Sequence, residues 1–276
     1  MCSPCEMIIL IKHAFIKLCR NGMSKKKTAG FRFYEELNDF LPADKKKKDI
    51  DYEFEGNPGI KDAIEAQGVP HPEVEIILVN GKSVDFHYKL RDQDRVSVYP
   101  VFESLDVRPL VRLRPEPLRE PRFVVDVHLG KLAANLRLLG FDTLYRNDYS
   151  DPEIVECSVR EHRIILTRDR GILKTGAVTH GYCVRSDSPL EQTREVLRRF
   201  DLYSRVKLYN RCIKCNGIIE PVDKNRIRDQ LPELAAKNYN RFHKCTKCGQ
   251  IYWKGSHFQR MQKKVEKILR DERGQV

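Results

Sequence analysis

Residues 123–126 read Phe-Val-Val-Asp, and residues 163–169 read Arg-Ile-Ile-Leu-Thr-Arg-Asp. Both are short apolar runs rich in Val and Ile, a pattern typical of strands that are buried on both faces of a parallel sheet. Ligands of such sheets bind in the crevice beyond the carboxyl ends of the strands. Because each run ends in an acid, Asp126 and Asp169 are expected to face one crevice. Hard divalent cations prefer oxygen ligands, so the sequence predicts a metal-dependent enzyme.

The segments around these two runs alternate between helix and strand patterns. Apolar residues recur at helical spacing from Leu129 to Leu139, and Gly140 is a suitable stop for that helix. The other expected elements are strands at 141–145 and 182–187 and helices at 151–162 and 189–200. This order predicts an α/β fold with a largely parallel sheet that is covered by helices on both faces.

Two Cys-x-x-Cys pairs follow, Cys212 with Cys215 and Cys245 with Cys248, separated by 29 residues. Four thiolates at this spacing suit a tetrahedral Zn²⁺ ion, and a shell of four cysteines leaves no open position for catalysis. The sequence therefore predicts a structural zinc ribbon. The other five cysteines have no regular spacing, which favours a reducing cytoplasm over a disulfide framework.

The net charge of +12 is unevenly distributed along the chain. Residues 31–106 carry 10 Lys and Arg against 17 Asp and Glu, a net −7, whereas residues 208–276 carry 16 against 7, a net +9. The basic end is a natural surface for nucleic-acid phosphates, although an ordinary solvated surface explains the charge equally well. No stretch approaches the ~20 apolar residues of a membrane-spanning helix, and the segment from Met7 to Cys19 lacks the layout of a secretory signal.

Residues 31–106 are expected to form a small β-rich domain. The expected elements are strands at 31–35, 50–55, 74–79 and 95–100 and a helix at 60–67. This set predicts a ubiquitin-like β-grasp fold, and residues 77–81 and 92–100 resemble the sulfur-carrier proteins of thiamin and molybdopterin synthesis. Those carriers act through a free C-terminal Gly-Gly, which is missing here because the strand continues into Val101-Phe102. Sulfur transfer is thereby excluded, and a docking or regulatory module remains.

Three motifs of the middle segment together carry a family resemblance. They are Asp126-Val127-His128-Leu129-Gly130-Lys131-Leu132-Ala133, Leu136-Arg137-Leu138-Leu139-Gly140-Phe141-Asp142 and Leu166-Thr167-Arg168-Asp169-Arg170. In these motifs the chain resembles the Mut-seven C-terminal family, a branch of the PIN-like nucleases that is often described as RNases. A β-grasp domain commonly precedes and a zinc ribbon follows in that family, so the resemblance covers about residues 31–260. It implies metal-assisted hydrolysis of RNA phosphodiester bonds by carboxylates that hold Mg²⁺ or Mn²⁺.

The resemblance implies catalytic roles for four aspartates. Asp126 and Asp169 are expected to bind the catalytic metal, with Asp151 as a third ligand and Asp187 as a fourth. Asp151 and Asp187 each stand beside a Pro at a predicted helix start, so either side chain could instead cap its helix. No helix start is expected immediately beyond Asp126 or Asp169.

RNA contacts are expected in two places. Lys131 and Arg168 are expected to bind phosphate beside the acids, with solvated surface charge as the alternative. Around the cysteines, aromatic and basic side chains interleave, which suits stacking on unpaired bases and attraction to the RNA backbone. The residues expected to contact RNA there are Lys214, Lys244, Lys247, Trp253 and Lys254. The alternative for Trp253 is packing in the small core of the ribbon.

The chain is therefore expected to have five parts. These are an N-terminal extension without order at 1–30, a β-grasp domain at 31–106, a linker rich in proline and arginine at 107–121, a PIN-like nuclease domain at 122–207, and a zinc ribbon with a basic C-terminal helix at 208–276. The predicted function is a cytoplasmic Mg²⁺- or Mn²⁺-dependent RNase whose zinc ribbon aids RNA binding. The alternative is a non-catalytic RNA-binding adaptor that recruits a protein partner through the β-grasp domain. A toxin-like nuclease is a third interpretation, against which the multi-domain layout argues.

Overall fold

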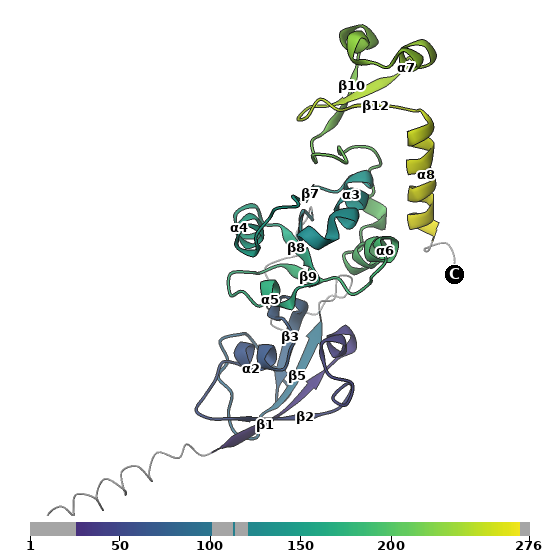
Figure 1. Cartoon of the computed structure of the whole chain (residues 1–276). Helices are drawn as coiled ribbons and strands as arrows, with labels where there is room; N and C mark the ends of the chain where they lie inside the picture. The colour runs from purple at the N-terminus through teal and green to yellow at the C-terminus, as the bar shows by residue number, and fades with distance from the viewer. Residues whose placement is uncertain (1–25, 101–112, 114–120, 271–276) are drawn as a thin grey trace, which may run out of the picture. The chain divides into compact units, whose positions relative to one another are not determined.

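The computed structural model describes residues 26–100, 113 and 121–270 (Figure 1). These residues form two compact units, one built mainly from residues 26–100 and the other mainly from residues 121–270, and each unit is considered by itself. Nearly all of the predicted linker and most of the predicted N-terminal extension lie outside the described residues. Within the described ranges, no helix is long and apolar enough to cross a membrane.

The first unit is a mixed five-stranded sheet with the strand order β2-β1-β5-β3-β4. Its elements are β1 (Lys27–Phe33), β2 (Ile50–Phe54), α2 (Ile60–Ala66), β3 (Val74–Val79), β4 (Lys82–Val84) and β5 (Arg95–Pro100). β1 pairs antiparallel with β2 and parallel with β5, and the inward side of α2 buries Ile60 and Ile64. This mixed sheet with one helix has the predicted ubiquitin-like arrangement.

β1 begins at Lys27, inside the range 1–30 that the sequence analysis assigned to an extension without order. Residues 27–30 read Lys-Thr-Ala-Gly, which lacks the apolar alternation of a half-buried strand. Backbone pairing extends the strand instead, because Lys27 lies opposite Phe54 and Gly30 lies opposite Asp51 in β2. The domain therefore starts earlier than its side-chain pattern indicates.

The second unit contains a four-stranded sheet with the order β7-β6-β8-β9, and all of its pairings are parallel. The elements of this part are β6 (Phe123–Val125), α3 (Gly130–Leu138), β7 (Thr143–Leu144), α4 (Asp151–Glu161), β8 (Ile164–Thr167), α5 (Arg170–Leu173), β9 (Gly181–Cys183) and α6 (Pro189–Arg199). The predicted parallel α/β fold is confirmed. The short helix α5 between β8 and β9 was not expected, because four residues are too few to show helical periodicity.

Both faces of this sheet are buried, as the continuous apolar runs predict. Phe123, Val125 and Leu166 face a core that also contains apolar residues of α3 and α6. Val124 and Ile165 point to the opposite face because side chains alternate along a strand. Both are fully buried, and α4 contacts β6 and β8 on that side.

A second, antiparallel sheet with the order β10-β11-β12 follows in the same unit. Its elements are β10 (Ile219–Val222), α7 (Glu233–Asn238), β11 (Phe242–Cys245) and β12 (Ile251–Trp253), and the helix α8 (Ser256–Leu269) comes after them. Figure 1 shows α8 running back from β12 toward α6, and the two helices are in contact. Val265 and Ile268 of α8 are buried in the same core as Phe123. The sequence predicts that this basic helix belongs with the zinc ribbon, but its apolar side completes the core of the parallel sheet.

Gly140 fixes the turn between α3 and β7. Its φ of +96° favours glycine, and a Cβ atom at this position would lie 2.1 Å from the carbonyl oxygen of Lys207. The N–H of Lys207 in turn donates to the carbonyl of Leu139. Gly140, the predicted helix stop, therefore also lies where the connector to the second sheet (residues 207–213) crosses the end of α3.

Candidate functional site

Two acids stand at the carboxyl ends of neighbouring parallel strands. Asp126 directly follows β6, Asp169 comes two residues after β8, and the register pairs Val125 with Leu166. The hydroxyl of Thr167 lies between them: it donates to Asp126 Oδ2 at 2.6 Å and accepts from the backbone N–H of Asp169 at 2.9 Å. The structure thus places Asp126 and Asp169 at one edge of the sheet, as their positions after the strands predict.

The surroundings of Asp126 and Asp169 differ. Asp126 is only 4% exposed, whereas Asp169 is exposed at the rim. The second oxygen of Asp126 accepts from the backbone N–H of His128 and lies 3.2 Å from His128 Nδ1. One carboxylate oxygen of Asp169 accepts from the N–H of Gly171 at 2.6 Å. Thr167 and His128 also belong to this edge, and although both lie in the quoted motifs, nothing in their sequence pattern predicts that role.

Helix capping falls on the two aspartates beyond which no helix start is expected. Asp126 caps the 3₁₀ turn Val127–Leu129, and Asp169 caps α5. Asp151 does not cap α4, because Ser150 occupies that position and forms a capping box with Glu153. The expectation failed because a 3₁₀ turn and a four-residue helix leave no periodic pattern by which their starts could be recognised.

Asp151 and Asp187 do not join the first pair. Asp151 is exposed at the start of α4, beside the capping box that Ser150 forms with Glu153. The side chain of Asp187 is 88% exposed and forms an ion pair of 2.6 Å with Arg168. Across residues 26–100, 113 and 121–270, the one group of three or more His, Cys, Asp or Glu side chains close enough to share a metal ion is formed by cysteines.

The loop that carries Asp187 is held by a single carboxylate. Glu195 of α6 accepts hydrogen bonds from the hydroxyl of Tyr182 and from the backbone N–H groups of Arg185 and Ser186, at 2.8–2.9 Å. Burial and the neighbouring Glu195 raise the pKa of Tyr182 well above its usual range. Glu195 therefore fixes the chain just before Asp187, and the side chain of Asp187 itself remains at the surface.

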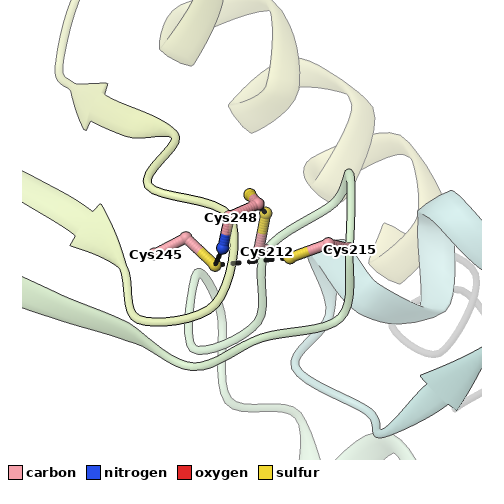
Figure 2. A group of neighbouring side chains, drawn as sticks. All are labelled: Cys212, Cys215, Cys245 and Cys248. Atoms are coloured by element: carbon pink, nitrogen blue, oxygen red, sulfur yellow. Dashed lines mark hydrogen bonds between the residues drawn. The ribbon is translucent and has the colours of Figure 1, made fainter.

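The second cluster consists of Cys212, Cys215, Cys245 and Cys248, whose sulfur atoms all lie within 4.8 Å of one another. Figure 2 shows the four side chains converging from two loops. The Sγ atoms of Cys212 and Cys248 are 3.7 Å apart, and those of Cys215 and Cys245 are 3.4 Å apart. A tetrahedral Zn²⁺ with bonds of about 2.3 Å needs sulfur atoms about 3.8 Å apart. The four cysteines therefore fit a zinc ion.

The backbone turn of the second cysteine loop brings two N–H groups to one sulfur atom. The N–H groups of Lys247 and Cys248 donate to Cys245 Sγ at 3.4 and 3.5 Å. Burial raises the pKa of the Cys245 thiol, but these two donors, together with the side chains of Cys215 and Cys248, outweigh it and bring the pKa down to about 7. A Cβ atom on Gly217 would lie 2.7 Å from Cys245 Sγ, so only glycine lets the first loop approach the second.

A buried polar network joins the first cysteine loop to the parallel sheet. Asn216 accepts from the backbone N–H of Thr143 in β7 and donates to Asp142 Oδ1 at 2.8 Å. Asp142 also accepts from Arg163 at 2.7 Å and from Arg211 at 3.1 Å. Burial raises the pKa of Asp142, but the hydrogen bonds from Arg163 and Asn216 hold it below its usual value. These hydrogen bonds and ion pairs hold the first cysteine loop against the parallel sheet. We call the group formed by Asp142, Arg163, Arg211 and Asn216 the charged joint.

The predicted RNA-binding side chains fall into two groups. Lys131 is exposed on α3 and Arg168 is paired with Asp187, as described above. Trp253 is half-buried, with its ring 6.3 Å from that of Phe242, so it packs in the ribbon and still reaches the surface. The remaining predicted contacts are exposed or half-buried on the ribbon: Lys214, Lys244, Lys247 and Lys254.

Comparison with family models gives two matches. The model of the Mut7-C RNAse domain matches residues 121–265, more than half of the 276 residues, and the model of the Mut7-C ubiquitin domain matches residues 26–106. The chain belongs to the Mut7-C RNAse domain family. Comparison with curated proteins and with solved structures gave no match.

The extent of the Mut7-C match agrees with the structure of the second unit. The match begins just before β6 and ends at residue 265, inside α8. It therefore includes the parallel sheet, the cysteine cluster and most of the helix that returns to the core. The resemblance found in the sequence motifs is confirmed, together with the ubiquitin domain before it, and the RNAse model supports a nuclease-like role for this unit.

Proposed function

We propose that this Mut7-C chain is a ribonuclease that depends on Mg²⁺ or Mn²⁺ and hydrolyses RNA phosphodiester bonds. The observation that carries the proposal is the arrangement of Asp126 and Asp169 after adjacent parallel strands, linked through the hydroxyl of Thr167. Mg²⁺ is commonly held by one or two protein carboxylates together with water and substrate phosphates. Two carboxylates at one edge of the sheet are therefore enough protein ligands for a Mg²⁺ ion.

Asp126 and Asp169 would hold the divalent ion, which would supply an activated water and would stabilise the charge that develops on the phosphate. The chain's own residues have distinct tasks in this scheme. Thr167 holds Asp126 and the backbone of Asp169 in a fixed relation, which is the usual task of residues behind a metal ligand. His128, whose side chain is 80% exposed beside Asp126, is placed to contact the substrate.

Asp151 and Asp187 act at the rim of this site in the proposal. Both are exposed, so neither pays a desolvation cost for meeting an ion brought in with the substrate. The pair of Asp187 with Arg168 would have to separate for Asp187 to serve as a ligand and for Arg168 to bind phosphate. Exposed pairs of this kind are weak enough to exchange with substrate. Lys131 offers another cation for the RNA backbone.

Zn²⁺ in the four-cysteine cluster has a structural role in the proposal, and the ribbon around it aids RNA binding. The basic residues of the ribbon and the half-buried Trp253 support that role. We place the enzyme in the cytoplasm, because thiolate ligands and the free thiols of Cys157 and Cys183 persist in a reducing compartment. The ubiquitin domain is proposed to recruit a protein partner.

The test is cleavage of a panel of labelled RNAs by the full chain with Mn²⁺ and without it. Asp126→Asn and Asp169→Asn are expected to reduce cleavage strongly, while the zinc content stays unchanged and the far-UV circular dichroism remains that of the folded chain. Asp148→Asn is the matched control, since Asp148 is an exposed aspartate that pairs with Arg146 in the loop after β7. Cleavage by the doubly substituted chain at the wild-type rate would refute the proposal.

A second candidate is a non-catalytic RNA-binding adaptor. The observation that favours it is that, within the described parts of the chain, the acids form no group of three that could share a metal ion. This candidate predicts salt-dependent RNA binding that survives both substitutions, with no cleavage in any metal. The same RNA panel therefore separates the two candidates.

A further inference from the structure

A groove of about 720 Å³ lies in the second unit between the cysteine ribbon, the connector at 207–213 and the start of α8. Its volume is within the range of sites for small ligands. One wall comes from the ribbon sheet, where Pro221, His243 and Tyr252 lie side by side across β10, β11 and β12. None of these residues belongs to the acid pair at the end of the parallel sheet.

The opposite walls are mostly apolar and aromatic. Leu208 of the connector is 41% exposed, although large apolar side chains are normally covered. The rings of Tyr209 and Phe258 are 4.7 Å apart, and both line the groove. Together with Tyr252 and Trp253 these side chains offer flat surfaces of the kind on which a nucleobase stacks.

The rim of the groove is cationic. Lys207, Arg241 and Lys254 line it, together with Arg211, whose charge is already paired with Asp142, and among the described residues that do so none is acidic. Arg241 and Lys254 immediately flank the paired positions Phe242 and Trp253 of β11 and β12. Continuation of that antiparallel register places these two cations opposite each other at one end of the groove. Aromatic walls with a positive rim are complementary to an unpaired base and its flanking phosphates.

A smaller hollow of about 450 Å³ lies next to the groove and shares four of its lining residues, Ile213, Tyr252, Trp253 and Met261. Lys214 and His257 line this hollow as well. Because Tyr252 and Trp253 border both spaces, a base in one hollow and the adjacent base in the other would share the same aromatic wall. Two neighbouring sites of this kind fit a single strand with splayed bases better than a stacked duplex.

We propose that this groove binds unpaired bases of single-stranded RNA and so holds the substrate of the nuclease site. The inference rests on the proposed function for its biological meaning, but binding at the groove is measurable without cleavage. In this proposal the ribbon contributes to RNA binding through one site, which lies where the ribbon meets the connector and α8. Trp253 forms part of the wall of that site.

The chain contains a single tryptophan, Trp253, so its fluorescence reports on the wall that the groove and the smaller hollow share. The experiment uses the full chain with Asp126→Asn and Asp169→Asn, which keeps the RNA intact, and a short unstructured oligouridylate as the probe. Binding is expected to quench the emission of Trp253 and to weaken steeply with salt. A duplex RNA of the same length is expected to bind with much less quenching.

Two sets of variants locate the contact. His243→Ala and the pair Arg241→Ala with Lys254→Ala remove groove side chains, and each is expected to weaken oligouridylate binding by roughly 5- to 150-fold, the equivalent of about 1–3 kcal/mol for a lost base contact. The matched control is Arg260→Ala with Lys263→Ala, which removes two exposed cations of α8 outside the groove. Zinc content and thermal midpoint are measured for every variant, to show that the ribbon is folded.

The outcomes separate this inference from the nuclease proposal. If the groove variants bind within about twofold of the control pair, or if Trp253 is not quenched, the inference is wrong even when the wild-type chain cleaves RNA. If Trp253 is quenched and the groove variants lose binding while no metal supports cleavage, the groove stands and the nuclease proposal fails. Equal quenching by single-stranded DNA would extend the ligand from RNA to any unpaired strand, and equal quenching by duplex RNA would contradict the proposal.

Discussion

Asp142→Asn tests the charged joint between the cysteine loop and the parallel sheet. The carboxylate is 18% exposed and accepts from Arg163 and Asn216 at one oxygen and from Arg211 at the other. An amide replaces one acceptor by a donor, which removes one charge-assisted hydrogen bond and weakens another. Because such bonds contribute about 1.5–3 kcal/mol each, the variant is expected to lose roughly 2–4 kcal/mol. For a unit of this size the thermal midpoint would fall by roughly 5–15 °C.

The assay is urea unfolding followed by the fluorescence of Trp253, the single tryptophan, and by far-UV circular dichroism. The pKa of Asp142 is held below its usual value, so its stabilising contribution is present at neutral pH and is lost as the pH falls through the folded pKa. The difference between wild type and variant should therefore be full at pH 7 and shrink only below about pH 4.

Asp148→Asn is the matched control for this prediction. Asp148 also pairs with an arginine at 2.9 Å, but the pair is exposed, so its removal is expected to leave the unfolding midpoint unchanged. If Asp142→Asn were as stable as Asp148→Asn at pH 7, the reasoning about the joint would be refuted. A difference that grew on acidification would contradict the assigned direction of the pKa shift.

Three further changes follow from the structure. Thr167→Val removes the hydroxyl between the two acids and is expected to weaken Mn²⁺ binding by about 10- to 100-fold in a titration. Thr143→Val removes another buried hydroxyl from the same sheet and should leave the Mn²⁺ affinity unchanged. Gly140→Ala forces a side chain into a left-handed backbone and is expected to cost at least about 1–3 kcal/mol in urea unfolding. Gly176→Ala, which meets open space, should be neutral, and equal stability of the two variants would be the contrary result. Cys248→Ser is expected to lower the zinc content below the one ion per chain that the ribbon predicts for wild type, and to shift tryptophan emission toward that of the unfolded chain. A zinc content equal to that of wild type would count against the ribbon.

The sequence was sufficient for features that depend on local pattern. The apolar runs before Asp126 and Asp169 predicted parallel strands because burial on both faces leaves no alternation. The spacing of the four cysteines predicted their convergence, since a tetrahedral ion permits few arrangements. Gly140 was recognisable as a helix stop. Each of these follows from residues close together in the chain or from a repeated spacing.

Features that depend on distant contacts were not predictable in the same way. The joint between Asp142 and Asn216 connects residues 74 positions apart, and neither stands in a pattern that signals a partner. The burial of Val265 and Ile268 beneath the parallel sheet was hidden by the basic face of α8. Asp187 is expected at the end of a strand, as Asp126 is, but β9 ends at Cys183, and the Asp187 side chain is almost fully exposed and paired with Arg168. The apolar pattern therefore predicts that a strand is present and leaves open where it ends and which way the following side chains point.

The most direct test of the central claim is a crystal of the full chain soaked in Mn²⁺. The account predicts an anomalous peak at the end of β6 and β8, with oxygen atoms of Asp126 and Asp169 at about 2.1 Å from the ion. The cysteine cluster should not take up the ion, because thiolates suit Zn²⁺ and Mn²⁺ prefers oxygen. A peak elsewhere in the unit, or an edge that stays empty while the same crystals cleave soaked RNA, would contradict the account.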